Sequence, residues 1–194
     1  MQEVRARGGV LYALADADYH LVWGTFYGRS ADSTAKYLTE SLRGFSRTIQ
    51  LDSTFHLAYE HLVQMYNSAA VPGSYLVLVG DTIKPGGPAA NERRIGTPEQ
   101  VTALRERAQI RGRDAAIGWV ASDSDAPDAR RILAEGYVAS RQADSAIAVY
   151  REALKRPTTA EPSFEWQIPL VKASEAMPSA GPELKAVMKR FSAD

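Results

Sequence analysis

The sequence predicts an all-α fold in which antiparallel helix pairs stack on one another. Over most of the 194 residues, apolar side chains recur every three or four positions, which is the period of an amphipathic helix. Residues that favour helix caps, and prolines that end helices, stand between these periodic segments. A similar pattern of aromatic and small residues also occurs twice, at 41–66 and at 129–157. We therefore expect residues 1–194 to form a single domain of helical repeats.

Three helices are expected in the first part of the chain, over about 9–27, 30–51 and 54–68. The first contains an apolar run that is short for a signal peptide, and its helical spacing continues to Trp23. The second begins at Ser30 or Asp32, because either residue is a suitable N-cap. The third carries its apolar residues as one stripe, at positions 55, 58, 59, 62, 63 and 66.

The middle of the chain is less regular. Residues 75–83 are rich in Val, Leu and Tyr, which fits either a strand or a buried helix, and the length of the segment does not decide between them. Residues 84–97 contain several prolines and glycines, so we expect them to form a loop.

A clear helix start follows this loop. Thr97 is placed as the N-cap, Pro98 as the first helical residue, and Gln100 as the partner that completes a capping box. We expect this helix to reach about residue 111, and a short separate helix to follow over 113–121.

The last third of the chain is also expected to be helical. Two helices are predicted over 128–141 and 143–156, and two more around Trp166 and over 183–191. Aspartates in the turn at 122–128 are suited to capping the first of these helices, since negative charge is favourable at a helix N-terminus.

The pattern that occurs twice is typical of a two-helix repeat. The first helix of such a repeat carries an aromatic residue, a leucine, a small residue and a second aromatic residue, and the second helix carries a small residue followed by an aromatic one. The matching positions are Tyr59, Leu62, Val63 and Tyr66, then Leu133, Ala134 and Tyr137 on first helices, with Ser41 and Phe45, then Ala146, Tyr150 and Ala153 on second helices. The step from Tyr66 to Tyr137 is close to two periods of about 34 residues. We therefore expect one irregular unit between them, over 67–128, with a long loop and the helices at 98–111 and 113–121.

At these residues the chain resembles the tetratricopeptide repeat family, in particular the repeat regions of bacterial multidomain signalling proteins. It departs from the family pattern at three positions, where Ser53 replaces a proline, Val63 replaces a small residue and Arg130 replaces an aromatic one. The resemblance implies an irregular tetratricopeptide-like α-α superhelix, with its clearest repeat segments at 41–66 and 129–157.

The resemblance also implies a function. Proteins of this family bind a protein or peptide partner on the concave surface formed by the first helices of their repeats. The positions that would face such a partner are Glu60, Gln64 and Asn67, and then Arg131, Glu135 and Val138. Two glutamates in this set disfavour the capture of a C-terminal carboxylate, because like charges repel. Alternatives are a structural subunit of a larger assembly and a small-molecule-binding sensor domain.

Composition excludes some other roles. The 23 Lys and Arg residues balance the 23 Asp and Glu residues, so the chain has no general attraction for nucleic acid. A local group of arginines, at 93, 94, 105, 107, 111 and 113, is interpreted as a solvated face. Cysteine is absent and no apolar run is long enough to span a membrane, which favours a cytoplasmic protein without excluding a periplasmic one.

The sequence predicts no metal site and no cofactor. The chain has three histidines, and a metalloprotease motif needs two of them four residues apart on one helix face. His56 and His61 are five apart, so they point in different directions, and His56 is expected to be a surface or capping residue.

No segment carries a motif typical of an enzyme. Residues 80–87 lack the Gly-Lys-Ser/Thr ending of a phosphate loop, residues 123–128 lack the spacing of a calcium loop, and there is no Gly-x-Ser-x-Gly sequence. We therefore expect a non-enzymatic protein without catalytic residues.

Overall fold

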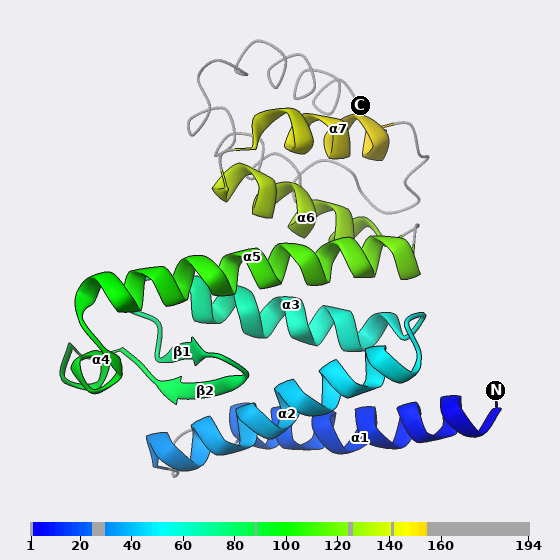
Figure 1. Cartoon of the computed structure of the whole chain (residues 1–194). Coiled ribbons are helices and arrows are strands. Elements are labelled where there is room, and N and C mark those ends of the chain that lie inside the picture. The colour runs from blue at the N-terminus through cyan, green and yellow to red at the C-terminus, as the bar shows by residue number, and fades with distance from the viewer. Residues whose placement is uncertain (1, 25–29, 88, 124–125, 141, 155–194) are drawn as a thin grey trace. The chain divides into compact units, whose positions relative to one another are not determined.

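The computed structural model describes residues 2–24, 30–87, 89–123, 126–140 and 142–154, and these residues are mainly helical (Figure 1). Within them the chain forms seven α-helices and one two-stranded sheet, so the predicted all-α class is confirmed except for this small sheet. The helices predicted around Trp166 and over 183–191 lie outside the described residues. Contacts divide the chain into two compact units, 1–122 and 123–194, which are described separately.

The three helices predicted at the start of unit 1 are present, although the first begins seven residues before the predicted start at residue 9, and its predicted end at 25–27 lies outside the described residues. They are α1 (Gln2–Gly24), α2 (Ala31–Leu51) and α3 (His56–Ala70). Ser30 caps α2, since its hydroxyl accepts a hydrogen bond from the Ser33 N–H at 3.2 Å. Asp52 closes the turn into α3 by accepting hydrogen bonds from the N–H and the hydroxyl of Thr54.

Helices α1 and α2 pack closely along their length. Gly44 of α2 faces Ala15 of α1, and a Cβ atom placed on Gly44 would lie only 2.6 Å from the Ala15 Cβ. The missing side chain therefore allows the two backbones to approach, and Leu38, Leu42 and Phe45 are buried on the same helix.

Residues 75–87, which the sequence leaves undecided, contain a β-hairpin. Strands β1 (Leu76–Val79) and β2 (Thr82–Pro85) pair antiparallel around a Gly80-Asp81 turn, in which Gly80 has a φ of 62°. The strand β2 packs on α2, where the Thr39 hydroxyl oxygen accepts the Ile83 N–H at 2.9 Å, and β1 packs on α3 and α5. Burial of Val77, Leu78 and Ile83 against these helices decides for the hairpin.

The prediction of a loop over 84–97 is wrong in part. Strand β2 extends to Pro85, and a short helix, α4 (Ala89–Ile95), follows. Glu92 of α4 pairs with Arg105, so a contact remote in sequence holds this helix.

Helix α5 (Pro98–Ser122) begins as predicted but does not end as predicted. Its capping box is present, because the Thr97 hydroxyl accepts the Gln100 N–H at 3.3 Å and the Gln100 amide oxygen accepts the Thr97 N–H at 2.8 Å. The prediction of two helices at 98–111 and 113–121 is wrong, since α5 continues through Gly112 as one 25-residue helix. A glycine inside a helix costs only about 1 kcal/mol, and packing offsets it.

That packing is against α3, which lies along α5 (Figure 1). A Cβ atom on Gly118 would come within 2.4 Å of the Tyr59 ring, and one on Gly112 would lie 2.6 Å from the Asn67 Oδ1 and 3.3 Å from the Tyr66 Cβ. The Tyr59 ring therefore packs over Gly118, and Asn67 and Tyr66 lie against Gly112. These contacts explain why both glycines stand inside a long helix.

Arg105 connects α5 to the end of α3, to the start of β1 and to α4. Its side chain is 7% exposed and donates hydrogen bonds to four backbone carbonyl oxygens, those of Ala69, Val71, Ser74 and Leu76, at 2.6–3.4 Å. It also pairs with the Glu92 carboxylate. One guanidinium therefore holds the last turn of α3, the α3–β1 connection and the start of β1 together.

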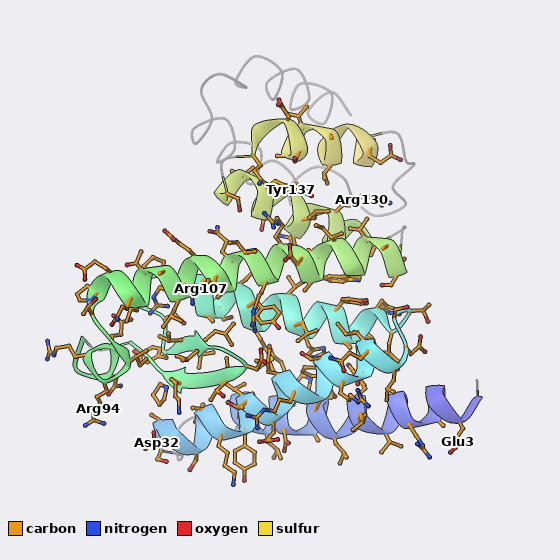
Figure 2. All side chains as sticks on the ribbon, in the orientation of Figure 1. Glu3, Asp32, Arg94, Arg107, Arg130 and Tyr137 are labelled. Carbon is orange, nitrogen blue, oxygen red and sulfur yellow. The ribbon has the colours of Figure 1, made fainter. Side chains whose placement is uncertain are left out.

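The interpretation of the arginine group as a solvated face is wrong for Arg105. Arg111 is partly exposed, and it donates to the Gly80 carbonyl at 3.0 Å and to the Asp81 carboxylate at 2.6 Å, so this surface contact ties the hairpin turn to α5. Arg93, Arg94 and Arg107 are exposed, and Figure 2 shows Arg94 projecting away from unit 1.

Unit 2 contains the two helices predicted there, α6 (Pro127–Ala139) and α7 (Ala143–Leu154), which pack against each other. Leu133, Ala134, Ala146 and Ile147 are buried. The prediction that an aspartate caps α6 is not supported, because the N-cap is Ala126, without a side-chain hydrogen bond, and Pro127 opens the helix. The side chains of Tyr150 and Ala153 lie outside the described residues.

None of the described helices combines the length and the apolar character that crossing a membrane requires.

We predict that Arg105→Met destabilises the protein much more than Arg107→Met. The first substitution keeps apolar bulk but leaves four carbonyl oxygens and Glu92 without their donor, which should lower the free energy of unfolding by roughly 2–4 kcal/mol. Arg107 is exposed on the same helix, so its substitution should cost less than about 0.5 kcal/mol. Urea denaturation measures both values, and equal stabilities of the two variants would contradict the role given to Arg105.

Candidate functional site

Two of the predicted partner-binding residues lie where α3 meets α1. Gln64 accepts a hydrogen bond from the Tyr19 hydroxyl of α1 at 3.1 Å and donates one to Glu60 at 3.3 Å. Residues from both helices meet here, and we call this surface the α1–α3 seam. Its members are Tyr12, Asp16, Tyr19 and His20 of α1 and Glu60, His61 and Gln64 of α3.

The other predicted residues occupy different surroundings. Asn67 is exposed on α3, next to Gly112 of α5. In unit 2, Arg131 and Glu135 form an ion pair at 3.1 Å along α6. Val138 is only 8% exposed and so offers little surface to a partner. Of the six residues, the structure brings Glu60 and Gln64 together at one surface.

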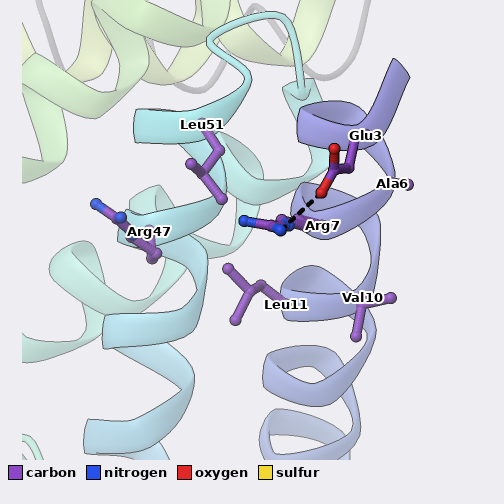
Figure 3. A pocket seen from close by; sticks show the side chains of 7 residues that line it. All are labelled: Glu3, Ala6, Arg7, Val10, Leu11, Arg47 and Leu51. Atoms are coloured by element: carbon purple, nitrogen blue, oxygen red, sulfur yellow. Dashed lines mark hydrogen bonds and ion pairs between the residues drawn. The ribbon is translucent and has the colours of Figure 1, made fainter. Parts of the chain in front are cut away.

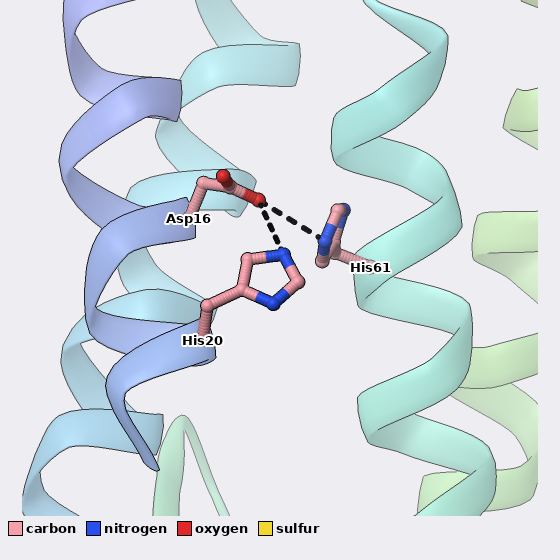
Figure 4. Close-up of side chains that lie close together, drawn as sticks. All are labelled: Asp16, His20 and His61. Carbon is pink, nitrogen blue, oxygen red and sulfur yellow. Dashed lines mark ion pairs between the residues drawn. The ribbon is translucent and has the colours of Figure 1, made fainter. Parts of the chain in front are cut away.

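The centre of the seam is a carboxylate between two imidazoles (Figure 4). The Asp16 Oδ1 atom lies 3.3 Å from the His20 Nε2 and 3.2 Å from the His61 Nε2. Asp16 and His20 are four residues apart on α1, which places them on one helix face, whereas His61 comes from α3. The side chain of His20 is 64% exposed and that of His61 is 11% exposed.

The His61 ring is held by two aromatic neighbours and at its far nitrogen. It stacks on Phe45 of α2, with centroids 4.7 Å apart, and Tyr19 meets it edge-on at 4.9 Å. Its Nδ1 atom lies 2.9 Å from the Leu57 carbonyl oxygen. Because a carbonyl oxygen only accepts hydrogen bonds, Nδ1 carries the proton and Nε2 is directed at Asp16.

Tyr12 completes the seam beside Asp16. Its hydroxyl donates to the Asp16 Oδ1 at 3.3 Å. Burial, followed by the negative charge of Asp16, the hydrogen bond to it and the charge of Glu60, raises the pKa of Tyr12 to about 12. The phenol therefore remains protonated at neutral pH and acts as a donor.

Sequence reasoning missed Asp16 and His20 as site residues. The only local signal is their spacing of four on an expected helix, and this spacing is common on helix surfaces. Their relation to His61 depends on the packing of two helices that are not consecutive. His56 is exposed at the first position of α3, as expected for a surface residue.

Comparison with protein-family models, with curated protein sequences and with solved structures finds no match to this chain.

The raised pKa of Tyr12 predicts a loss of stability at alkaline pH. A group whose folded-state pKa lies above its ordinary value of 10 contributes stability below pH 10, and this contribution is lost as pH rises toward 12. Tyr12→Phe should therefore show a smaller decrease in the free energy of unfolding between pH 10 and 12 than the wild type. Urea denaturation across this range measures the difference, and the exposed-ring variant Tyr75→Phe should retain the wild-type loss.

Proposed function

We propose that this chain is a non-enzymatic helical-repeat scaffold of the tetratricopeptide type, which binds a protein or peptide partner on the surface of its first helices. The observation that supports it is the pairing of helices α1 with α2, α3 with α5, and α6 with α7. In this arrangement α1 and α3 are the first helices of neighbouring pairs, and their side chains meet at the α1–α3 seam.

The repeat assignment differs from the expected one in its middle unit. Since α5 is a single helix, it serves as the second helix of the pair that α3 begins, and the hairpin and α4 are an insertion between them. The segment from Tyr66 to Tyr137 then contains one pair with an insertion instead of two periods. Three pairs, at about 2–51, 56–122 and 127–154, account for the described helices.

The packing between α3 and α5 supports this assignment. In a two-helix repeat, bulky residues on the first helix pack against small residues on the second, because neither helix can bury its apolar face alone. The packing of the Tyr59 ring over Gly118 has this character.

The α1–α3 seam has the chemistry of a partner-binding surface. Aromatic rings lie beneath it, with Tyr12 packed against Phe45 at 5.6 Å and against Phe55 at 4.8 Å. Glu60 and Gln64 present polar groups above these rings. Such groups fix the register of a bound segment, and the carboxylates of Asp16 and Glu60 favour a segment that carries Lys or Arg.

Partner capture from an extract of the source cells tests this proposal. Glu60→Lys reverses a charge at the seam, and we expect at least about a tenfold weaker recovery of the partner, the effect of losing about 1.4 kcal/mol. Gln64→Ala should weaken recovery less, because it removes a neutral hydrogen-bonding group. Glu106→Lys is the matched control, since it makes the same change on an exposed position of α5. Recovery that is the same for the wild type and both seam variants would contradict the proposal.

A second candidate function, a structural subunit of a larger assembly, is favoured by the outer face of α1. Exposed apolar residues follow one another at helical spacing along it, at Ala6, Val10, Ala13, Leu14, Ala17 and Leu21. Val10 and Leu14 are each 62% exposed. The outer helix of a repeat array normally presents a polar face, so this stripe fits a surface that another helix covers.

A surface pocket adjoins this stripe, between the first turns of α1 and the end of α2 (Figure 3). It has a volume of about 540 Å³ and a mainly apolar lining, in which Leu11 and Leu51 take part beside the Glu3–Arg7 ion pair. An apolar side chain of a partner would fit this depression next to Val10.

Leu14→Glu distinguishes the two functions. If the chain is an assembly subunit, Leu14→Glu should abolish the recovery of its partner, and Glu60→Lys should leave recovery unchanged. If the chain is a groove-binding scaffold, Glu60→Lys should weaken recovery, and Leu14→Glu should leave it unchanged. Because Leu14 is largely exposed, the free energy of unfolding should change by less than about 0.5 kcal/mol. Leu57→Glu, at an exposed apolar position of α3, controls for the added charge.

A further inference from the structure

We propose that Asp16, His20 and His61 form a binding site for a divalent transition-metal ion, with Zn²⁺ as the representative ion, which links α1 to α3. One ligand atom from each residue lies within 4.8 Å of the other two. Two imidazole nitrogens and a carboxylate oxygen are a donor set that protein zinc sites use. The site lies within the α1–α3 seam, but the proposal of metal binding does not rest on the partner-binding function.

The distances between the ligand atoms fit the size of such an ion. Zinc binds imidazole nitrogen and carboxylate oxygen at about 2.0–2.2 Å, so two ligands of a tetrahedral site lie about 3.3 Å apart. The Asp16 Oδ1 atom is 3.3 Å from the His20 Nε2 and 3.2 Å from the His61 Nε2. Small rotations of these side chains would therefore complete the coordination.

The hydrogen bond at the far side of His61 supports the same assignment. Since Nδ1 donates to the Leu57 carbonyl at 2.9 Å, Nε2 is the ring nitrogen available to bind a metal ion beside the Asp16 oxygen. Histidine ligands in metal sites commonly donate their other N–H to a backbone carbonyl in this way.

Further contacts orient the remaining ligands. The Tyr12 hydroxyl donates to the Asp16 carboxylate, and the stacking of His61 on Phe45 fixes its ring plane. His20 is mostly exposed, so at least one coordination position would face solvent and hold water or a side chain of a partner. The site therefore has three protein ligands from two helices and an exchangeable fourth position.

The donor set also selects among metals. Imidazole ligands suit Zn²⁺ and its neighbours Co²⁺, Ni²⁺ and Cu²⁺, whereas Mg²⁺ and Ca²⁺ require sites built from oxygen atoms. We therefore expect binding of Zn²⁺ and no comparable binding of Mg²⁺.

Calorimetric titration of the full chain with zinc chloride, after treatment with a chelator, tests the proposal. We expect one ion per chain and a loss of affinity of at least about 100-fold in Asp16→Asn and in His20→Ala, because ligand loss should exceed the 10–100-fold effect of second-shell changes. His20 is exposed, so its substitution leaves the core intact. His56→Ala, which removes the one histidine outside the cluster, should bind zinc as the wild type does.

Thermal unfolding provides a second measurement. Zinc should raise the unfolding midpoint of the wild type and of His56→Ala, because an ion that binds only the folded state stabilises it, and should not raise that of His20→Ala. The absence of zinc binding by the wild type would overturn the proposal. Equal weakening by His56→Ala and His20→Ala would overturn it as well.

Discussion

The buried guanidinium of Arg105 is the interaction on which the architecture of unit 1 depends. The chain leaves α3 through a connection that forms no regular structure, and Arg105 donates to carbonyl groups on both sides of it and within it, at Ala69, Val71, Ser74 and Leu76. In doing so it fixes the hairpin and α4 against one end of α5. Because an inserted segment without such an anchor would carry unsatisfied backbone groups into the interior, the insertion and the arginine are coupled.

The position of the insertion leaves one face of α3 free to meet α1. Another face is occupied by α5, where Tyr59 packs over Gly118 and Asn67 lies against Gly112. The close approach of α1 and α2 at Gly44 then places Asp16 and His20 within reach of His61. The geometry of the polar α1–α3 seam therefore depends on the close helix contact at Gly44 as well as on the seam residues themselves. Partner binding and metal binding would both use this surface, while the apolar stripe of α1 faces elsewhere.

Local sequence was sufficient where local interactions decide the structure. Ser30 as an N-cap and the Thr97–Gln100 capping box were predictable because their hydrogen bonds involve neighbours in the chain. The same reasoning failed at Gly112, where a contact with α3 stabilises a helix that local propensity would interrupt. It also failed for Arg105, since charge in a sequence indicates exposure unless distant carbonyl groups are known to surround it.

The sequence by itself determined the helical class and most helix boundaries, and it placed Glu60 and Gln64 on one face of a helix, because periodicity and caps are local properties of the chain. Only the tertiary structure decided that 76–85 is a hairpin, that α5 is continuous, and that Asp16, His20 and His61 converge. The physical reason is the same in each case. These features depend on which helices become neighbours, and that choice is made by burial, close glycine contacts and the donors of Arg105, none of which adjacent residues reveal.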